Sequence, residues 1–201
     1  MDNSKKIILD LCGGTGSWSK PYKEAGYDVK LITLPEHDVL TYEPPIGGQK
    51  VYGILAAPPC THFSIACNRL WDVKDKNGKT IEGLQVLIAC LRIIAKIEPT
   101  FWVIENPVGR MKRFMGKPDY SFKFTDFGFP CRKQSLLWGN FNHPIKQVHQ
   151  YERIYKLEEI DYKMPELYRT EGIIETDHSR RAAVRSITPE GFARAFFEAN
   201  Q

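Results

Sequence analysis

KIILDLCGGTG, residues Lys6–Gly16, joins a short apolar run to a glycine-rich turn. The apolar residues predict a buried strand. The three glycines allow the following backbone to turn tightly and to approach a ligand closely. The spacing differs from the Gly-x-Gly-x-x-Gly pattern of dinucleotide sites, because Gly16 is followed by Ser17-Trp18-Ser19. The turn therefore predicts a site for a nucleotide, a dinucleotide or S-adenosylmethionine, or a tight strand-to-helix turn that binds nothing.

Strands and helices are predicted to alternate outward from this turn. Apolar residues recur at helical spacing over 81–97, and Thr188 is a candidate N-cap with Pro189 in the first turn of a last helix. We expect helices over residues 17–25, 81–97 and 188–199, and strands over 27–33, 49–57, 101–104 and 135–138. This order predicts an α/β, Rossmann-like fold whose sheet is mostly parallel, with helices on both faces.

Length and composition indicate one globular domain over residues 1–201. Of the 201 residues, 42% are hydrophobic and 26% are charged. The sequence contains no apolar run of membrane-spanning length, and Met1–Lys6 lacks the apolar stretch of a secretory signal, so we expect a cytoplasmic protein without a membrane partner. The five cysteines form no Cys-x-x-Cys pair, which favours neither disulfides nor a metal site. Cys67, Cys90 and Cys131 are expected to be small buried residues.

The net charge of +4 permits a nucleic-acid partner without requiring one. Basic residues cluster at Arg110–Arg113, at Arg132-Lys133 and around Arg180, Arg181 and Arg185. Such clusters are usually solvated surface, and contact with phosphates is the alternative.

Three chemically suggestive segments follow predicted strands, where ligands of open α/β sheets bind. They are Asp10–Gly16, Pro58-Pro59-Cys60 and Glu105-Asn106-Pro107. Two prolines fix the backbone before Cys60, so its thiol is either a rigidly held nucleophile or a buried structural residue. Glu105 is either an acid whose pKa is raised by an apolar setting or a surface residue that caps a turn.

The order of these motifs resembles the cytosine-5 DNA methyltransferase family, and in particular the short versions carried by phages and bacteria. The glycine-rich turn is similar to the family's cofactor loop, and Ala57–Ser64 resembles its Pro-Pro-Cys loop. Glu105-Asn106-Pro107 resembles the Glu-Asn-Val motif, and Asp126–Lys133 the later Tyr-Gly-Val-Pro-Gln-x-Arg segment. Arg185–Pro189 with the last helix resembles the family's chain end. The resemblance covers most of the chain outside about residues 140–180.

The resemblance implies methyl transfer from S-adenosylmethionine to carbon 5 of cytosine. Cys60 would attack carbon 6 of the ring, and Glu105 would protonate or hydrogen-bond N3. Either Arg132 or Lys133 would polarise O2, because the segment departs from the family's Gln-x-Arg-x-Arg spacing. The base must be flipped out of a duplex or already single-stranded.

The resemblance also implies where the cofactor binds. The turn formed by Asp10, Leu11, Cys12, Gly13, Gly14, Thr15 and Gly16 would lie beside the methionine part. Asp38, followed by Val39, matches a position that binds the adenine amine, and Pro59 would line the pocket. Two departures stand out: Cys12 replaces a common phenylalanine, and the second strand ends at Thr33 without an immediate carboxylate, for which Glu36 is the substitute.

Recognition of the nucleic acid is less defined. Residues 68–79 resemble the family's mobile loop, in which Trp71 would press against the vacated base stack or cover the pocket. The insert available for sequence readout, about residues 140–184, is small, which predicts a short target or a partner that supplies specificity. DNA is the expected substrate. RNA, or a silent domain that binds cofactor or nucleic acid, is the alternative, and the oligomeric state is left open.

Overall fold

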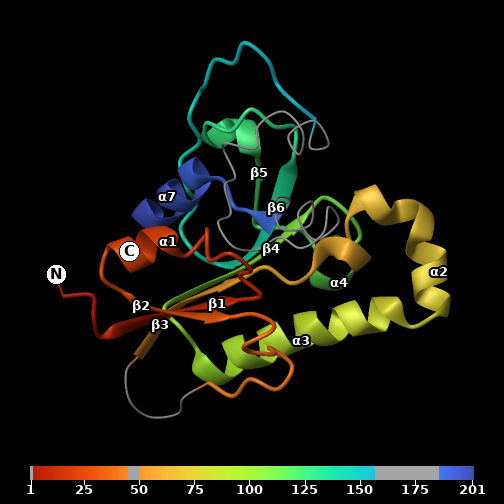
Figure 1. Ribbon diagram of the computed structural model, residues 1–201, viewed down its shortest axis with the longest axis horizontal. Helices are drawn as coiled ribbons and strands as arrows, with labels where there is room; N and C mark the ends of the chain where they lie inside the picture. The colour runs from red at the N-terminus through yellow and green to blue at the C-terminus, as the bar shows by residue number, and fades with distance from the viewer. Residues whose placement is uncertain (1, 45–49, 157–185) are drawn as a thin grey trace.

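The computed structural model describes residues 2–44, 50–156 and 186–201, and one six-stranded sheet forms its centre (Figure 1). The strand order is β2-β1-β3-β4-β6-β5. Strands β2, β1, β3 and β4 are parallel, whereas β6 is antiparallel to both β4 and β5. The strands are β1 (Lys6–Leu11), β2 (Asp28–Ile32), β3 (Lys50–Ala56), β4 (Phe101–Pro107), β5 (Tyr120–Lys123) and β6 (Gln134–Asn140).

Helices cover both faces of the sheet, as the sequence predicts. The α-helices are α1 (Lys20–Glu24), α2 (Trp71–Lys76), α3 (Lys79–Ile97), α4 (Lys112–Met115) and α7 (Glu190–Ala199). Short 3₁₀ helices are η1 (Cys60–His62), η2 (Ile65–Leu70) and η3 (Phe124–Phe127). Helix α3 lies on one side of the sheet, and α1 and α7 lie together on the other side (Figure 1).

Alternation of side chains along the strands separates two hydrophobic cores. In β1, Leu9 and Leu11 face the α3 core, which contains Ile93, whereas Ile8 faces the core that contains Phe192 of α7. This two-sided burial explains why the strand sequence is continuously apolar. The predicted Rossmann-like α/β architecture is therefore confirmed.

Several predicted boundaries are corrected by local structure. Residues 17–19 form a turn, so α1 begins only at Lys20. Thr188 is not the N-cap of α7, because Pro189 occupies that position and the Thr188 N–H donates to Ser17 Oγ at 2.9 Å. Glu105-Asn106-Pro107 continue β4 rather than follow it, since β6 pairs with them.

Two further segments add to the expected elements. Residues 68–79, which resemble a mobile loop in the sequence, contain the end of η2 and the helix α2. Strand β5 was not predicted at all. Residues 157–184 of the expected recognition insert lie outside the described residues, as do Arg180, Arg181 and Arg185. Within the described parts of the chain, no helix is long and apolar enough to span a bilayer.

Candidate active site

Cys60 lies four residues after the end of the parallel strand β3, at the first residue of η1. The Cys60 carbonyl oxygen accepts backbone hydrogen bonds from Phe63 at 3.0 Å and from Ser64 at 2.8 Å. These bonds close a tight turn, and the preceding Pro58-Pro59 restricts the backbone that leads into it. Cys60 is exposed, whereas Cys90 and Cys131 are buried as predicted. Cys67 is only half-buried, so the expectation that it is buried is wrong.

Glu105 lies on β4, the neighbour of β3 in the sheet. The pairing of these strands ends at Ala56 opposite Ile104, one residue before Glu105. Glu105 is half-buried and lies opposite Leu137 of β6. A side-chain hydrogen bond of 2.9 Å from Asn106 to the Pro58 carbonyl then connects the two chain segments beyond the paired region. Sheet pairing and this bond bring the segments of Cys60 and Glu105 to the same edge.

Three titratable groups act on the Cys60 thiol: the side chains of Lys133, Glu105 and Cys67. Although Cys60 is exposed at the surface, the protein packed around its sulfur partly removes it from water, and this desolvation raises the pKa of the thiol. The ammonium of Lys133 opposes this by lowering the pKa. The carboxylate of Glu105 and the thiol of Cys67 raise the pKa of Cys60 further. The resting thiol therefore favours its protonated form, and its activation depends on the balance between Lys133 and Glu105.

A cavity of about 30 Å³ lies beside Glu105 and Lys133. Its walls also include Trp18, Ser135 and Ser186. The Ser135 hydroxyl and the Trp18 indole nitrogen are buried and have no hydrogen-bond partner among the described residues. This volume suits a water molecule rather than a pyrimidine ring, so a base would enter only after the walls move apart. Neither Ser135 nor Trp18 carried a signal in the sequence, because Ser135 belongs to a segment predicted only as a strand and Trp18 to one predicted only as a helix.

Lys133, and not Arg132, reaches this cavity. The Lys133 ammonium lies 4.8 Å from the centre of the Phe124 ring, which also lines the cavity. Arg132 is exposed, does not line the cavity, and has its backbone N–H bonded to the Tyr155 carbonyl at 3.1 Å. The two residues that the sequence left as alternatives are thus separated by the geometry.

The glycine-rich loop, which is the predicted cofactor site, is built around a buried carboxylate. Asp10 is fully buried, and the Ser19 hydroxyl donates a 2.5 Å hydrogen bond to its Oδ2. A Cβ atom at Gly13 would lie 2.3 Å from Asp10 Cγ, so glycine is required there to cover the carboxylate. Burial raises the pKa of Asp10 to about 6, and the hydrogen bond from Ser19 partly opposes the rise.

The loop backbone has the tight conformation that the glycines predict. Gly14 and Gly16 have positive φ angles of 55° and 69°, and Cys12 shares this region at 58°. The Cys12 N–H donates to the Ile32 carbonyl at 2.8 Å, which joins the ends of β1 and β2. The hydroxyl of Thr15 is buried without a hydrogen-bond partner in the described residues, so it is an orphaned polar atom inside the predicted cradle.

The other residues predicted to bind the cofactor differ in how deeply they are buried. Leu11 and Val39 are buried in the hydrophobic core, and Thr33 and Asp38 are half-buried. Glu36 and Pro59 are exposed. Asp38 Oδ1 accepts a 2.9 Å hydrogen bond from the Leu40 N–H, which fixes the turn after β2. The ends of β1 and β2 are adjacent, so Thr33, Glu36 and Asp38 lie on the β2 side of the glycine-rich loop, whereas Pro59 follows β3, on the other side of β1.

Cys12 faces the α3 side of the sheet. Its thiol hydrogen-bonds the buried thiol of Cys90, and this contact is the main cause of the raised pKa of Cys90. Cys12 therefore packs against the core at the base of the loop. No group of three or more metal-ligating side chains occurs in residues 2–44, 50–156 or 186–201.

A second, wider hollow is lined by neither Cys60 nor Glu105. It has a volume of about 540 Å³ and is lined by Lys20 and Glu24 of α1, by His149, and by Arg194 of α7. Residues 187–189 line both this hollow and the small cavity at Glu105, and so they form the wall between the two.

The chain is similar in sequence to two curated DNA methyltransferases. It is 30% identical over 149 residues to "Probable DNA (cytosine-5)-methyltransferase" of Frog virus 3 (isolate Goorha), a match covering 65% of this chain and 69% of the relative. It is 28% identical over 123 residues to "Type II methyltransferase M.DdeI" of Desulfomicrobium norvegicum, a match covering 51% of this chain but only 28% of the relative. No protein-family model matches the chain.

Among solved structures, the fold is similar to that of a protein assigned as a DNA modification methyltransferase encoded within an E. coli prophage. The TM-score is 0.47 at 20% sequence identity, and the match covers 79% of this chain and 55% of the other.

Proposed function

Because the chain belongs to the cytosine-5 DNA methyltransferase family, we propose that it transfers a methyl group from S-adenosylmethionine to carbon 5 of cytosine in DNA. The observation that carries this proposal is the shared neighbourhood of Cys60, Glu105 and Lys133 at one edge of the sheet. A nucleophile, an acid and a cation are the groups that attack on an aromatic ring carbon requires.

The proposed reaction begins when the Cys60 thiolate adds to carbon 6 of the ring. The electron pair displaced by this addition moves toward N3, and Glu105 gives N3 a proton or a hydrogen bond, so that no full negative charge develops on the ring. Lys133 favours the thiolate before the attack, and its ammonium is the candidate to polarise the ring oxygen O2.

Carbon 5 then becomes nucleophilic, and the bound cofactor would supply the methyl group from its sulfonium, which is left as a neutral thioether. Water takes the proton from carbon 5, the electrons of that bond re-form the ring double bond, and the Cys60 thiolate leaves carbon 6. Any proton gained by N3 returns to Glu105. The orphaned hydroxyl of Ser135 and the indole N–H of Trp18 supply further polar groups in this cavity, next to Glu105.

The loop over residues 10–16 supports binding of the cofactor. The buried Thr15 hydroxyl has no hydrogen-bond partner among the described residues, and a Cβ atom built at Gly14 would meet the Ser186 hydroxyl oxygen at 3.7 Å, an ordinary contact. In the half-buried carboxylate of Asp38, Oδ1 accepts the hydrogen bond from Leu40. The second oxygen, Oδ2, is suited to accept a hydrogen bond from the adenine amine. Glu36, after β2, and Pro59, after β3, are exposed on either side of this loop and would complete the walls.

A covalent trap tests the proposal. DNA containing 5-fluorocytosine should form a stable adduct with the wild type when cofactor is present, because the fluorine on carbon 5 cannot leave as a proton does. Peptide mapping should find the adduct on Cys60. Cys60→Ser should abolish it, and Cys67→Ser, which removes the neighbouring half-exposed thiol, should not.

The same experiment separates the alternatives. An RNA oligonucleotide of equal sequence, tested beside the DNA, reports which polymer is used. Folded protein that binds cofactor but gives no adduct with either polymer would favour a silent domain and would overturn the proposal.

A further inference from the structure

Arg110 lies five residues after Glu105 and is the only charged side chain of its basic cluster that is buried, with 3% of its surface exposed. The expectation that the cluster Arg110–Arg113 forms a solvated surface is therefore wrong for this residue. Its backbone N–H donates to the Phe63 carbonyl at 2.8 Å, just after the turn that carries Cys60. Burying a guanidinium destabilises the fold unless its N–H donors are hydrogen-bonded. The partners of Arg110 therefore show what its burial holds together.

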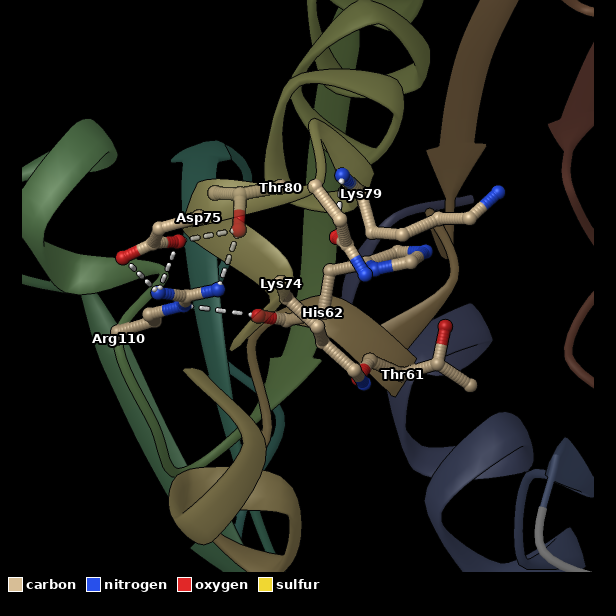
Figure 2. Close-up of polar contacts among 8 residues, drawn as sticks. Thr61, His62, Lys74, Asp75, Lys79, Thr80 and Arg110 are labelled. Atoms are coloured by element: carbon tan, nitrogen blue, oxygen red, sulfur yellow. Dashed lines mark hydrogen bonds and ion pairs between the residues drawn. The ribbon is translucent and has the colours of Figure 1, made fainter. Parts of the chain in front are cut away.

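The guanidinium of Arg110 joins three separate segments of the chain (Figure 2). Its Nε donates to the carbonyl oxygen of His62 in η1 at 2.8 Å. One terminal nitrogen donates to both carboxylate oxygens of Asp75 in α2, at 2.8 and 3.1 Å, and the other to the Thr80 hydroxyl in α3 at 2.6 Å. The Thr80 hydroxyl in turn bonds Asp75, which closes the network.

Further contacts press the same segments together. The Trp71 ring lies 5.0 Å from the Arg110 guanidinium and 5.6 Å from that of Arg113, so two cations hold it in place. The Lys74 ammonium donates to the Thr61 carbonyl (Figure 2). At Gly109, an added Cβ would lie 2.0 Å from the Phe63 carbonyl oxygen, so the backbones after β4 and after Cys60 are in direct contact.

The exposed partner of this network is Asp75. Its side chain is 52% exposed, while that of Arg110 is 3% exposed, so the ion pair links the interior to the surface. The hydrogen bond from Thr80 and the charge of Arg110 lower the pKa of Asp75, which keeps the pair ionised at neutral pH. Removing the Asp75 charge would leave a buried cation without its counter-ion.

We propose that Arg110 is a positioning residue for the reaction: it holds the turn of Cys60 against the strand of Glu105 and fixes α2 and the start of α3 over that turn. This inference rests on the proposed function. It follows that Trp71 is part of the same assembly and would have to leave both guanidinium groups before it could enter a base stack.

Variants around Arg110 test the proposal in a Cys67→Ser background. Arg110→Lys keeps a positive charge but cannot hold three segments at once. Asp75→Asn and Thr80→Val each remove one partner and leave Arg110 itself in place. Glu82→Gln is the matched control, because it breaks an exposed ion pair with Lys79 on the same turn of α3.

The positioning role predicts a split between chemistry and cofactor binding. For Arg110→Lys we expect adduct formation with 5-fluorocytosine DNA to slow at least ~10-fold, the loss typical of a displaced catalytic group. Cofactor affinity should change less than about twofold, since the cofactor loop does not touch Arg110. Asp75→Asn should slow the reaction less, and Glu82→Gln should match the wild type. Slowing that only tracks the folded fraction of each variant would indicate a purely structural role and overturn the proposal.

A second readout needs neither DNA nor cofactor, so the two proposals can fail separately. Amide hydrogen exchange over residues 61–78 and the rate of Cys60 alkylation by iodoacetamide are measured on the protein alone. Asp75→Asn and Thr80→Val should speed the exchange of that segment at least ~10-fold and change the alkylation rate, and Glu82→Gln should do neither. If both quantities stay at the wild-type values, Arg110 does not position the turn, whatever the wild type does with DNA. If they change but the wild type forms no adduct, the proposed function fails instead.

Discussion

The side-chain amide of Asn106 donates a hydrogen bond of 2.9 Å to the carbonyl oxygen of Pro58. Asn106 is fully buried and directly follows Glu105, and Pro58 lies two residues before Cys60. Pairing between the two strands has already ended at this point, with Ala56 opposite Ile104. The bond therefore extends the register of the sheet into the segments that carry the thiol and the acid.

Asn106→Ala should weaken both stability and chemistry. The variant leaves the buried Pro58 carbonyl without a donor, which costs about 1–3 kcal/mol of the free energy of unfolding. Urea denaturation measures this loss, and the rate of adduct formation with 5-fluorocytosine DNA should fall beyond what the folded fraction explains. Asn140→Ala, at the exposed end of β6, is the control and should change neither. An unchanged adduct rate in a folded Asn106→Ala protein would show that the bond has no part in aligning the site.

The titration of Cys60 should respond in opposite directions to its two charged neighbours. Lys133 lowers the pKa of the thiol and Glu105 raises it. Lys133→Met should therefore move the midpoint of Cys60 alkylation against pH upward, and Glu105→Gln should move it downward. The exposed substitution Lys117→Met should leave the midpoint in place. Midpoints that shift together, or not at all, would contradict the geometry around the thiol.

Glu105→Gln should also separate chemistry from binding. A glutamine at N3 cannot give up a proton, so methyl transfer should slow by roughly 10²–10⁴-fold, the usual contribution of a general acid. Cofactor affinity, measured by calorimetry, should stay close to that of the wild type, because Glu105 is not part of the loop over residues 10–16. Turnover near the wild-type rate would remove Glu105 from the mechanism.

The elements that the sequence predicts correctly are those with strong local signals. The apolar run before Gly13, the helical spacing of residues 81–97 and the prolines before Cys60 each define an element, and the sheet assembles from them. Strand β5 was missed because Tyr120–Lys123 is only four residues long and shows little alternation of apolar and polar side chains. Glu105 lies inside β4 because pairing with β6, a long-range contact, extends the strand beyond the apolar run.

Some residues of the candidate site are named by motifs in the sequence, and others come to notice only in the structure. Cys60 and Glu105 come from motifs, whereas Ser135 is an ordinary strand residue whose hydroxyl gains meaning only from the cavity. Arg110 looks like surface charge in the sequence, because its partners Asp75 and Thr80 lie 35 and 30 positions away along the chain. Such contacts depend on tertiary packing and leave no local pattern.

Gly13 and Asp10 should show strong coupling. Gly13→Ala places a Cβ 2.3 Å from Asp10 Cγ, so the loop must shift and both stability and cofactor affinity should fall. In Asp10→Ala/Gly13→Ala the opposing carboxyl is gone, so part of the loss should be recovered, and the double variant should be less damaged than the sum of the two single ones. Thermal unfolding and cofactor titration are measured on the wild type, the two single variants and the double variant, which together form a double-mutant cycle. Additive losses would mean that alanine at 13 fails for a reason other than this contact.

Stability should depend on pH through Asp10. Burial raises its pKa from 3.8 to about 6 in the folded protein, so the folded state binds a proton more tightly than the unfolded state. The stabilising contribution is therefore complete below pH 3.8 and is lost as the pH rises through about 6. At 1.36 kcal/mol for each unit of pKa, the total loss is about 3 kcal/mol.

Asp10→Asn tests this, because asparagine cannot titrate but keeps an acceptor for the Ser19 hydroxyl. The difference in free energy of unfolding between the wild type and this variant, from urea titrations, should change across pH 3.8 to 6 and then level off. Asp72→Asn, at an exposed position of α2, should give a difference that does not vary in this window. A flat difference for Asp10→Asn would mean that the carboxyl under the cofactor loop ionises as easily as one in water, and that a bound water or a cation solvates it there.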